Sequence, residues 1–396
     1  MSKSRVPGYP SHRGASTTRV AIVGGGLTGC ATAYAFAAAG IDVILLEAER
    51  LGSGRTAHSF GWVSDTPDPA FQATSRAAGL RDARRAWQAW RRAALDFAAL
   101  VRRLDLRCHL EAGSAVHLAR TPPEILTLKK DAQARREAGL DTAVVTGTAA
   151  RALTGIETMG ALRTKDSATL DPYRAVLGLA GAAAARGAAI FERSPVRKTK
   201  FSASGVDVET ARGTVRAERV VIATGRPGAL SPALARHVRT RSTFLAMTEP
   251  IPGRLRRLLG EPSIVTTDSA VPAHAIRWVG GERLLVAGAD ADAVPARLRE
   301  KTVVQRTGQL MYELSTLYPD ISGIAPAFGW EAPYGSTADG LPFIGPHRNF
   351  PRHLFAFGSS PHRVTDAYLA SRVLLRHHLG EPDPADAAFG FTSGRL

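Results

Sequence analysis

Three glycines in the stretch VAIVGGGLTGC, residues 20–30, constrain what this chain can fold into more than any other feature. Gly24, Gly26 and Gly29 have the spacing G-x-G-x-x-G. In that pattern the first glycine makes a tight turn, the second lets the backbone approach a pyrophosphate, and the third lets a helix pack closely on a strand. The motif is short, so its meaning depends on the elements that flank it.

The elements around the glycines complete a β-α-β unit. Apolar residues at 19–23 predict a buried strand, and the alanine-rich residues 30–39 predict a helix that ends at Gly40. A second apolar strand over residues 42–46 ends at Glu47, whose carboxylate is placed to bind two ribose hydroxyls and to repel a 2′-phosphate. Free N–H groups at the start of the helix would face the phosphates. The sequence therefore predicts a dinucleotide site, with NAD and FAD both left open at this point.

Length and composition limit the class of protein. At 396 residues the chain is longer than one hydrophobic core usually serves, and 44% apolar residues suffice for a packed interior. Its two cysteines, Cys30 and Cys108, exclude a disulfide framework and a thiolate zinc site, and we expect no metal. Residues 1–18 are polar and lack the apolar core of a secretory signal, so we expect a disordered N-terminus on a soluble, cytoplasmic protein.

The formal net charge of +16 is unusual, and a cluster of arginines lies within residues 80–104. In that segment Trp87, Trp90 and other apolar residues recur every three or four positions and predict an amphipathic helix. We expect the apolar stripe to be buried and the arginines to form its solvated side, and we expect no nucleic-acid partner. Binding of this helix to RNA or a membrane is the alternative, and a peripheral contact with an anionic membrane is left open.

Three further stretches carry a resemblance to a known family. GSGRTAHSFGWVSD, residues 52–65, follows the ribose-binding acid; RVVIATG, residues 219–225, matches a second strand that touches the cofactor; and STADGLPFIGP, residues 336–346, is similar to the signature T-x-D-G-L-P-x-I-G. Together with the glycine-rich start, they resemble the D-amino-acid oxidase superfamily of FAD-dependent oxidoreductases. The resemblance runs in order over residues 19–392.

The resemblance implies an α/β fold with two interleaved domains. One is a Rossmann-like FAD-binding domain with a parallel sheet, helices and a β-meander, and the other is an α+β substrate domain built on an antiparallel sheet. We expect residues 19–105, 150–240 and 325–392 to form the FAD-binding domain, and residues 106–149 and 241–324 to form the substrate domain.

The resemblance also implies an activity. We expect an enzyme that oxidises the C–N bond of an amine or amino acid (D-amino acid, glycine or N-methyl amino acid type) by hydride transfer to flavin N5, with oxygen or a quinone as electron acceptor. Such chemistry depends on placement and electrostatics more than on a protein base. The sequence accordingly lacks the G-x-S-x-G, H-E-x-x-H and P-loop motifs, which disfavours hydrolase and kinase functions.

The residues that the resemblance assigns to FAD binding lie in the glycine-rich turn, after the second strand and in the carboxy-terminal half. They are Gly24, Gly26, Leu27, Thr28, Gly29, Glu47, Ala48, Arg55, Thr56, His58, Ser59, Val196, Thr224, Gly225, Asp339, Gly340, Gly345, Gly358, Val364 and Thr365. Many family members bind FAD without a covalent bond, which we expect here. His58 lies in T-x-H-x-x-G, where some relatives attach flavin through histidine, so a covalent link through His58 is the alternative.

Three residues are candidates for contact with the substrate. Arg277 lies in the strand-like stretch AHAIRWV, where alternation places it on the same face as Ala275, and an arginine fork suits a substrate carboxylate. Tyr334 is a candidate hydroxyl donor, and Arg363 is a candidate either to add positive charge beside the reduced flavin or to bind a substrate anion.

The loop SSPHR, residues 359–363, departs from the family, which usually has glycines there. We expect the helix that begins near Thr365 still to point its positive N-terminus at the flavin. The loop nevertheless supports a second hypothesis, in which the chain is an FAD-binding protein of the same fold whose catalysis is lost or redirected and which acts as a partner or scaffold.

Overall fold

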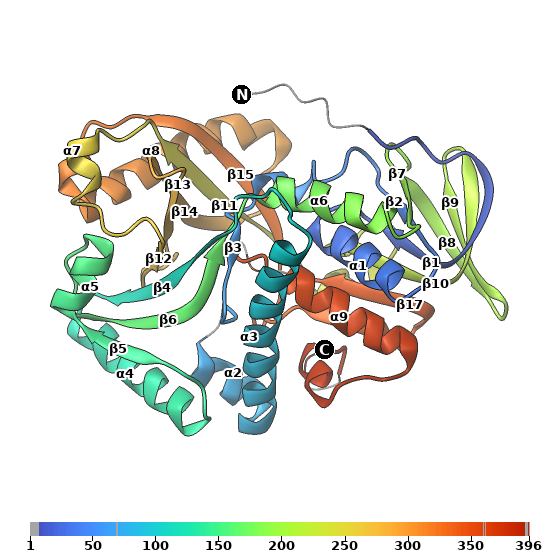
Figure 1. The fold of residues 1–396 in the computed structure, drawn as a ribbon, viewed down its shortest axis with the longest axis horizontal. Coiled ribbons are helices and arrows are strands. Elements are labelled where there is room, and N and C mark those ends of the chain that lie inside the picture. Colours follow the sequence, from blue (N-terminus) through green and yellow to red (C-terminus); the bar gives the residue numbers. More distant parts are fainter. Residues whose placement is uncertain (1–7, 69, 359, 361, 393–394, 396) are drawn as a thin grey trace.

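Two β-sheets lie side by side, each with helices packed on it, and the chain alternates between them (Figure 1). The computed structural model describes residues 8–68, 70–358, 360, 362–392 and 395. One sheet is mainly parallel and the other mainly antiparallel. This arrangement confirms the expected fold class, a Rossmann-like α/β part interleaved with a part built on an antiparallel sheet.

The first sheet carries the glycine-rich turn. Its strands are β1 (Gly14–Val23), β2 (Val43–Leu46), β7 (Ala189–Phe191), β8 (Val196–Ser202), β9 (Gly205–Thr210), β10 (Gly213–Gly225), β16 (Phe343–His347) and β17 (Phe350–Phe357). The order is β16-β17-β10-β1-β2-β7, parallel from β17 to β7, and β8 and β9 form an antiparallel meander with β10. Strand β1 is buried from Val20 to Val23, as expected for an apolar run at the centre of a parallel sheet.

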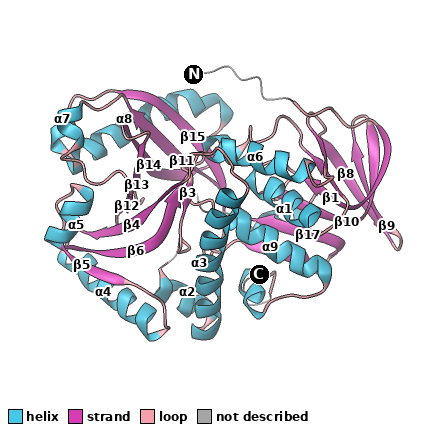
Figure 2. Cartoon of the chain, in the orientation of Figure 1, coloured by secondary structure: helices cyan, strands magenta, loops and turns pink. Residues whose placement is uncertain are grey.

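Helices cover one face of this sheet, and the meander covers the other. The helices are α1 (Leu27–Ala38), α6 (Pro172–Ala184) and α9 (Thr365–Leu379), with α3 (Leu80–Arg103) packed against α9 (Figure 2). On the opposite face Val206 and Val208 of the meander pack with Ala21 and Ile44. The carboxyl ends of β1 and β2 and the N-terminus of α1 therefore meet at one edge, where parallel α/β sheets bind their ligands.

Helix α3 has the amphipathic structure that its sequence predicts. Trp87 and Trp90 are 3% and 1% exposed, while Arg81, Arg91 and Arg92 are exposed. Trp90 packs in the core beneath α1 and α9, and Trp87 packs on Phe71 of the short helix α2 (Phe71–Ala78). The aromatic face is thus core and is not offered to a membrane or RNA. Contact of the basic side with an anionic membrane stays a prediction.

The second sheet, called here the roof sheet, has nine strands. They are β3 (Trp62–Val63), β4 (Glu111–Ala119), β5 (Ala143–Thr146), β6 (Gly160–Thr169), β11 (Arg239–Thr248), β12 (Ile264–Thr267), β13 (Ala275–Val279), β14 (Arg283–Asp292) and β15 (Pro326–Ser336). The order is β15-β11-β14-β13-β12-β4-β6-β3, antiparallel apart from the β4–β12 pair, and β5 pairs with β6.

Three helices cover the face of the roof sheet that points away from the first sheet, namely α5 (Gly147–Thr154), α7 (Gly253–Arg256) and α8 (Arg299–Leu317). Helix α4 (Pro122–Glu137) packs on the other face, where its Leu128 and Ala132 contact Ala119 of β4 and Leu162 of β6. From α8, Leu310 and Leu314 pack on Phe244 and Val286 of the roof sheet. The opposite face of the sheet packs on Phe60 and Trp62, which lie in the segment that follows the glycine-rich unit. The inner face of the roof sheet thus lies over the expected cofactor site.

Three strands lie in the other sheet than the expected domain segments imply. Strands β3, β6 and β15, which we expected in the FAD-binding part, belong to the roof sheet, where β3 and β4 pair with β6 and β15 pairs with β11. Each pairing joins segments far apart in sequence, and periodicity within one strand does not reveal its partner.

The amino-terminal segment also differs from the expectation. Gly14–Thr18 were expected to be disordered but form the start of β1, because they pair with residues 213–217 of β10. Ahead of them, the His12 N–H donates to Ser194 Oγ at 2.9 Å. Residues 1–7 lie outside the described part of the chain. Within that part, no helix has both the length and the apolar character needed to cross a bilayer.

Candidate functional site

The glycine-rich turn has room for nothing larger than glycine at two of its positions. Gly24 has φ +109°, and a Cβ placed there would lie 2.7 Å from the Ala223 carbonyl oxygen. A Cβ on Gly29 would lie 1.8 Å from the Gly24 carbonyl oxygen, which is far inside van der Waals contact. The turn is therefore closed tightly against β10 and α1, as a phosphate-binding turn requires.

The N-terminus of α1 is open toward this turn. Gly26 is its N-cap residue and supplies no side chain to the first N–H groups of the helix. The Leu27 N–H donates to Thr56 Oγ1 at 3.1 Å, and a Cβ on Gly26 would lie 3.2 Å from that hydroxyl. Free N–H groups and the helix dipole favour an anionic ligand here.

Glu47 is fixed at the end of β2 and points toward the turn. Its Oε2 accepts the Gly25 N–H at 2.5 Å, and its Oε1 accepts the Glu49 N–H at 2.8 Å. The side chain is half-buried and lines a cavity of about 430 Å³ together with the glycine-rich turn. This is the position expected for the residue that binds the ribose hydroxyls.

Eleven of the predicted FAD-binding residues line the 430 Å³ cavity. They are Gly24, Gly26, Leu27, Thr28, Glu47, Ala48, Arg55, Thr56, Val196, Thr224 and Gly225. A cavity of this size lies within the usual range for a bound small molecule, roughly 300–1,000 Å³. The turn that excludes a Cβ, the open helix N-terminus and the carboxylate opposite them fit the adenosine and pyrophosphate half of FAD.

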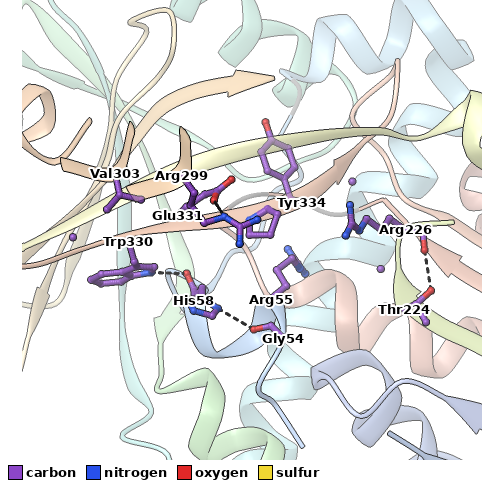
Figure 3. A pocket seen from close by; sticks show the side chains of 14 residues that line it. Gly54, Arg55, His58, Thr224, Arg226, Arg299, Val303, Trp330, Glu331 and Tyr334 are labelled. Atoms are coloured by element: carbon purple, nitrogen blue, oxygen red, sulfur yellow. Dashed lines mark hydrogen bonds and ion pairs between the residues drawn. The ribbon is translucent and has the colours of Figure 1, made fainter. Parts of the chain in front are cut away.

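A second cavity of about 590 Å³ adjoins the first. The two share Gly54, Arg55, Thr224 and Gly225, and the second continues beneath β15 to Tyr334 (Figure 3). Together they form a continuous path from the glycine-rich turn to the inner face of the roof sheet. The flavin half of the cofactor would extend along this path, from the adenosine end toward the roof sheet.

His58 lines the second cavity, as the resemblance implies. It ends a short 3-10 segment, Arg55–His58, and its Nδ1 lies 3.1 Å from the Gly54 carbonyl oxygen. Trp330 Nε1 donates to the His58 carbonyl at 3.1 Å and fixes this segment against β15 (Figure 3). A covalent link through His58 stays a prediction.

Arg55 connects the two cavities to the N-terminus of α9. Its Nη1 donates to the Ser360 carbonyl oxygen at 2.8 Å, and its Nη2 lies 3.7 Å from Asp366 Oδ2. Asp366 is buried in the first turn of α9, and this burial raises the pKa of its carboxyl group to about 6. Ser359 and Pro361, two residues of the departing loop, lie outside the described residues.

The remaining predicted FAD-binding residues line neither cavity. Thr365 is buried and donates its hydroxyl to the Ser64 carbonyl at 2.8 Å, and Ser59 and Val364 are also buried. Asp339 is paired with Arg395, whose Nη2 donates to Oδ1 at 2.9 Å. Gly340 and Gly358 adopt positive φ angles in a turn and directly after β17, and Gly345 does so in the middle of β16. Contact of these residues with FAD stays a prediction.

The three candidate substrate residues are already engaged by the protein. Arg277 Nε donates to the Phe60 carbonyl at 2.8 Å and Nη1 to the Trp278 carbonyl at 3.2 Å, and burial lowers its pKa to about 10. Arg363 forms an ion pair with Asp68, and burial lowers its pKa to about 9.

The third candidate, Tyr334, lines the second cavity and donates its hydroxyl to Asp290 Oδ2 at 2.9 Å. The structure thus brings Tyr334 to the cofactor path. Arg277 instead ties the roof sheet to the segment below it.

Sequence reasoning missed three residues on and below the roof sheet. Arg241 Nε, Asp290 Oδ1 and His362 Nδ1 are buried atoms without a hydrogen-bond partner among the described residues. Arg363 Nε and Asp366 Oδ1, from the start of α9, belong to the same group. Buried polar atoms are almost always paired, so such a group indicates a place where a ligand or water completes the bonding. The one sequence signal for Asp290 was the polar stretch ADAD, residues 289–292, which ends the otherwise apolar strand β14.

The fold and the site define a dinucleotide-dependent oxidoreductase, and the comparisons with known proteins specify the family. A family model described as "FAD dependent oxidoreductase" (DAO) matches residues 19–376. The chain therefore belongs to the DAO family of FAD-dependent oxidoreductases, and it is an FAD-dependent enzyme.

Two relatives show the range of the family in sequence. The chain is 24% identical over 379 residues to gamma-glutamylputrescine oxidoreductase of Escherichia coli, covering 94% of this chain and 86% of that protein. It is 25% identical over 372 residues to glycine oxidase of Bacillus licheniformis, covering 91% and 93% respectively.

Solved structures agree on the fold. Glycine oxidase from Geobacillus kaustophilus has a TM-score of 0.76 at 22% identity, covering 96% of this chain and 99% of that one. L-proline dehydrogenase from P. horikoshii has a TM-score of 0.77 at 18% identity, covering 96% and 100%. At these identities the likeness concerns the fold alone.

Proposed function

We propose that this enzyme oxidises the C–N bond of an amine or amino acid, of the D-amino acid, glycine or N-methyl amino acid type. In this reaction FAD supplies a two-electron acceptor that takes the substrate hydride at N5. The imine product then hydrolyses in water, and the electrons pass on to oxygen or a quinone. The names of the relatives, an oxidoreductase of an amine conjugate and oxidases of glycine, support this class of substrate.

The observation that carries the proposal is the continuous cavity path that ends beneath the roof sheet. At one end Glu47, the N-terminus of α1 and Thr56 are placed to hold the ribose and the phosphates. At the other end lie Tyr334 and the half-buried His58.

The protein's own part in the reaction is to bind, orient and exclude water. The inner face of the roof sheet is apolar between β11 and β13, where Leu245, Leu285 and Ala275 are fully or almost fully buried. An apolar cover keeps water from the reacting centre and strengthens the electrostatic contacts made there. These residues thus form an apolar, water-excluding surface against which a small polar substrate is oriented.

Anaerobic reduction of the bound flavin tests the proposal. The holoenzyme is mixed without oxygen with glycine, sarcosine, D-amino acids and polyamines, and the flavin absorption band is followed. We expect at least one compound to bleach the band, and readmitted oxygen or an added quinone to restore it. The proposal would be contradicted if dithionite reduced the flavin of the holoenzyme but none of these substrates bleached its absorption band.

A second candidate function rests on the loop before α9. Arg363 lies in the loop where the family usually has glycines, and its guanidinium stacks 4.4 Å from the Trp62 ring centroid and pairs with Asp68. These contacts tie the loop to β3 and reduce its freedom next to the cofactor path. The protein would then bind FAD as a scaffold without turnover, and in the same experiment no amine or amino acid would reduce the flavin.

Acid precipitation of the holoenzyme tests the role of His58. Non-covalent FAD, which we expect, stays in the supernatant, whereas flavin bound through His58 goes to the pellet. His58→Ala would release the flavin from the pellet only in the covalent case.

A further inference from the structure

A single arginine supplies the side-chain positive charge of the cavity that fits the pyrophosphate. Among the described residues that line the 430 Å³ cavity, Arg55 is the only cation, whereas Glu47 and Glu49 are both acidic. The N-terminus of α1 adds roughly half a positive charge, which does not balance the two negative charges of a pyrophosphate. Arg55 also lines the second cavity, so it lies at the junction of the cofactor path (Figure 3).

A buried carboxylate contacts the same guanidinium. Asp366 Oδ2 lies 3.7 Å from Arg55 Nη2, and the Asp366 side chain is 5% exposed and lines neither cavity. Arg55 Nη1 donates to the Ser360 carbonyl oxygen at 2.8 Å, which holds the guanidinium against the start of α9. Asp366 Oδ1 has no hydrogen-bond partner among the described residues. The carboxylate is therefore half-paired, and its ion pair is with the cation that the cofactor also needs.

Few other charges act on Asp366. Arg363, from the loop before α9, also favours the ionised carboxylate, but it pairs with Asp68 and is acted on by Asp65, from the segment after β3. Helix α1, which packs on α9, has no charged residue, and the buried residues of α3 are all apolar. Strand β17 packs on α9 with apolar side chains, and β16 contacts it at the far end, near His377. The ionisation of Asp366 thus depends mainly on burial and on Arg55.

Burial and the ion pair act in opposite directions on this carboxyl group. Burial raises the pKa of Asp366 to about 6, whereas the positive charge of Arg55 lowers it. A phosphate beside Arg55 would weaken that lowering effect, because one guanidinium cannot fully balance two anionic groups. The phosphate would also bring further negative charge near Asp366. Both effects favour the protonated carboxyl.

We propose that Asp366 is a positioning residue that competes with the FAD pyrophosphate for Arg55, so that FAD binds most tightly when Asp366 is protonated. Asp366 acts through Arg55 and does not itself touch the cofactor. Binding of FAD then takes up one proton wherever the free protein has Asp366 ionised. The inference concerns the affinity for the cofactor and does not depend on the substrate.

The direction of the pH dependence follows from linkage. Below about pH 6 the carboxyl is protonated with and without FAD, and the affinity is at its maximum. As the pH rises through about 6, the free protein loses the proton first and the affinity falls. An arginine beside a carboxylate typically changes its proton affinity by roughly 10- to 1,000-fold. Partial loss of that interaction corresponds to a change in FAD affinity on the order of 10-fold.

Release of flavin from the diluted holoenzyme measures this effect. Freed FAD regains its fluorescence, and dilution series at several pH values between 5.5 and 8.5 give the dissociation constant at each. The variants are Asp366→Asn, Arg55→Gln and the double variant. The control is Asp96→Asn, which removes an exposed carboxylate of α3 that pairs with Arg92.

We expect the wild type and the control to bind FAD more weakly at pH 8.5 than at pH 5.5, by on the order of 10-fold. Asp366→Asn should keep the low-pH affinity throughout the range. Arg55→Gln should bind FAD more weakly at every pH and with little pH dependence. Adding Asp366→Asn to Arg55→Gln should change nothing further, because the contested cation is gone.

The wild-type profile alone can refute the inference, since an affinity that does not vary between pH 5.5 and pH 8.5 leaves no role for the proton. A pH dependence that persists in Asp366→Asn also overturns it. Weaker FAD binding by Asp366→Asn at every pH would show instead that the carboxylate helps to hold Arg55 for the cofactor. Each of these results is separate from the proposed function, which is tested by bleaching of the flavin and not by its affinity.

Discussion

Replacing Asp366 by asparagine is expected to change how the stability of this protein depends on pH. The Asp366 carboxyl is buried in the first turn of α9, beside Arg55 at the junction of the two cavities. Burial raises its pKa from the usual 3.8 to about 6, although the positive charge of Arg55 acts in the opposite direction. The folded protein therefore binds this proton more tightly than the unfolded chain does.

The sign and size of the effect follow from that difference. The stabilising contribution of the protonated carboxyl is present in full below pH 3.8 and is lost as the pH rises through about 6. At about 1.4 kcal/mol for each tenfold change in proton affinity, the loss amounts to about 3 kcal/mol at neutral pH. Asparagine resembles the protonated form and has no such loss. The free energy of unfolding of Asp366→Asn, relative to that of the wild type, should thus increase by about 3 kcal/mol between pH 4 and pH 7.

Urea unfolding at a series of pH values between 4 and 7 measures this gain. The control is Asp96→Asn, an exposed carboxylate that pairs with Arg92 at 2.9 Å and is expected to contribute little. The difference in unfolding free energy between Asp366→Asn and the wild type should grow with pH, and the control should stay flat. A difference that does not vary with pH, or that favours the wild type at pH 7, would refute this description of the α9 N-terminus.

Three further predictions concern the cofactor site and the outer part of the roof sheet. Gly29→Ala is expected to abolish FAD binding, because its Cβ would lie 1.8 Å from a carbonyl oxygen, whereas Gly181→Ala has open space and should bind FAD normally; flavin content after purification checks both. Glu47→Gln should weaken FAD binding by about 10- to 100-fold, the usual value for a charge-assisted hydrogen bond, as measured by flavin fluorescence quenching; an unchanged affinity would exclude the ribose contact. His274 is held between Asp268 and Glu313, and although burial lowers its pKa, these hydrogen bonds raise it to about 9. The contribution of protonated His274 to the stability of the fold is present in full below pH 6.5 and is lost as the pH rises through about 9. The unfolding temperature of the wild type should therefore fall more steeply than that of His274→Gln between pH 7 and pH 10.

Elements with a long, regular pattern could be predicted closely from the sequence. The predicted helix over 80–104 is observed as Leu80–Arg103, and the last helix was expected to begin near Thr365, where α9 starts. In each case one apolar face repeats over several turns, and that signal depends only on neighbours in sequence. The glycine-rich turn is equally local, since the lack of space at Gly24 and Gly29 arises from the strand and helix beside them.

Pairing between distant strands could not be predicted in the same way. β15 joins β11, about ninety residues earlier in the chain, and β6 joins β4, so both fall on the other side of the expected boundaries. Alternation within a strand shows which residues share a face but does not show which strand lies alongside.

The substrate end of the site shows the same limit at the level of single side chains. Alternation placed Arg277 on the same face as Ala275, and in the structure this is the inner face, from which Arg277 contacts Phe60. That its N–H groups are used by backbone carbonyls depends on a loop more than two hundred residues away. The unpaired atoms of Arg241 and Asp290 are likewise a property of their surroundings, which no local pattern records.

Competition at the adenosine end of the site tests the central claim most directly. Deflavinated protein is titrated with FAD, alone and in the presence of ADP or adenosine 2′,5′-bisphosphate, and flavin fluorescence reports binding. If the turn at Gly24 and the carboxylate of Glu47 hold the adenosine half of FAD, one FAD binds per chain, ADP competes with it, and the 2′-phosphate analogue does not. Failure of FAD to bind, or equal competition by both nucleotides, would contradict the account.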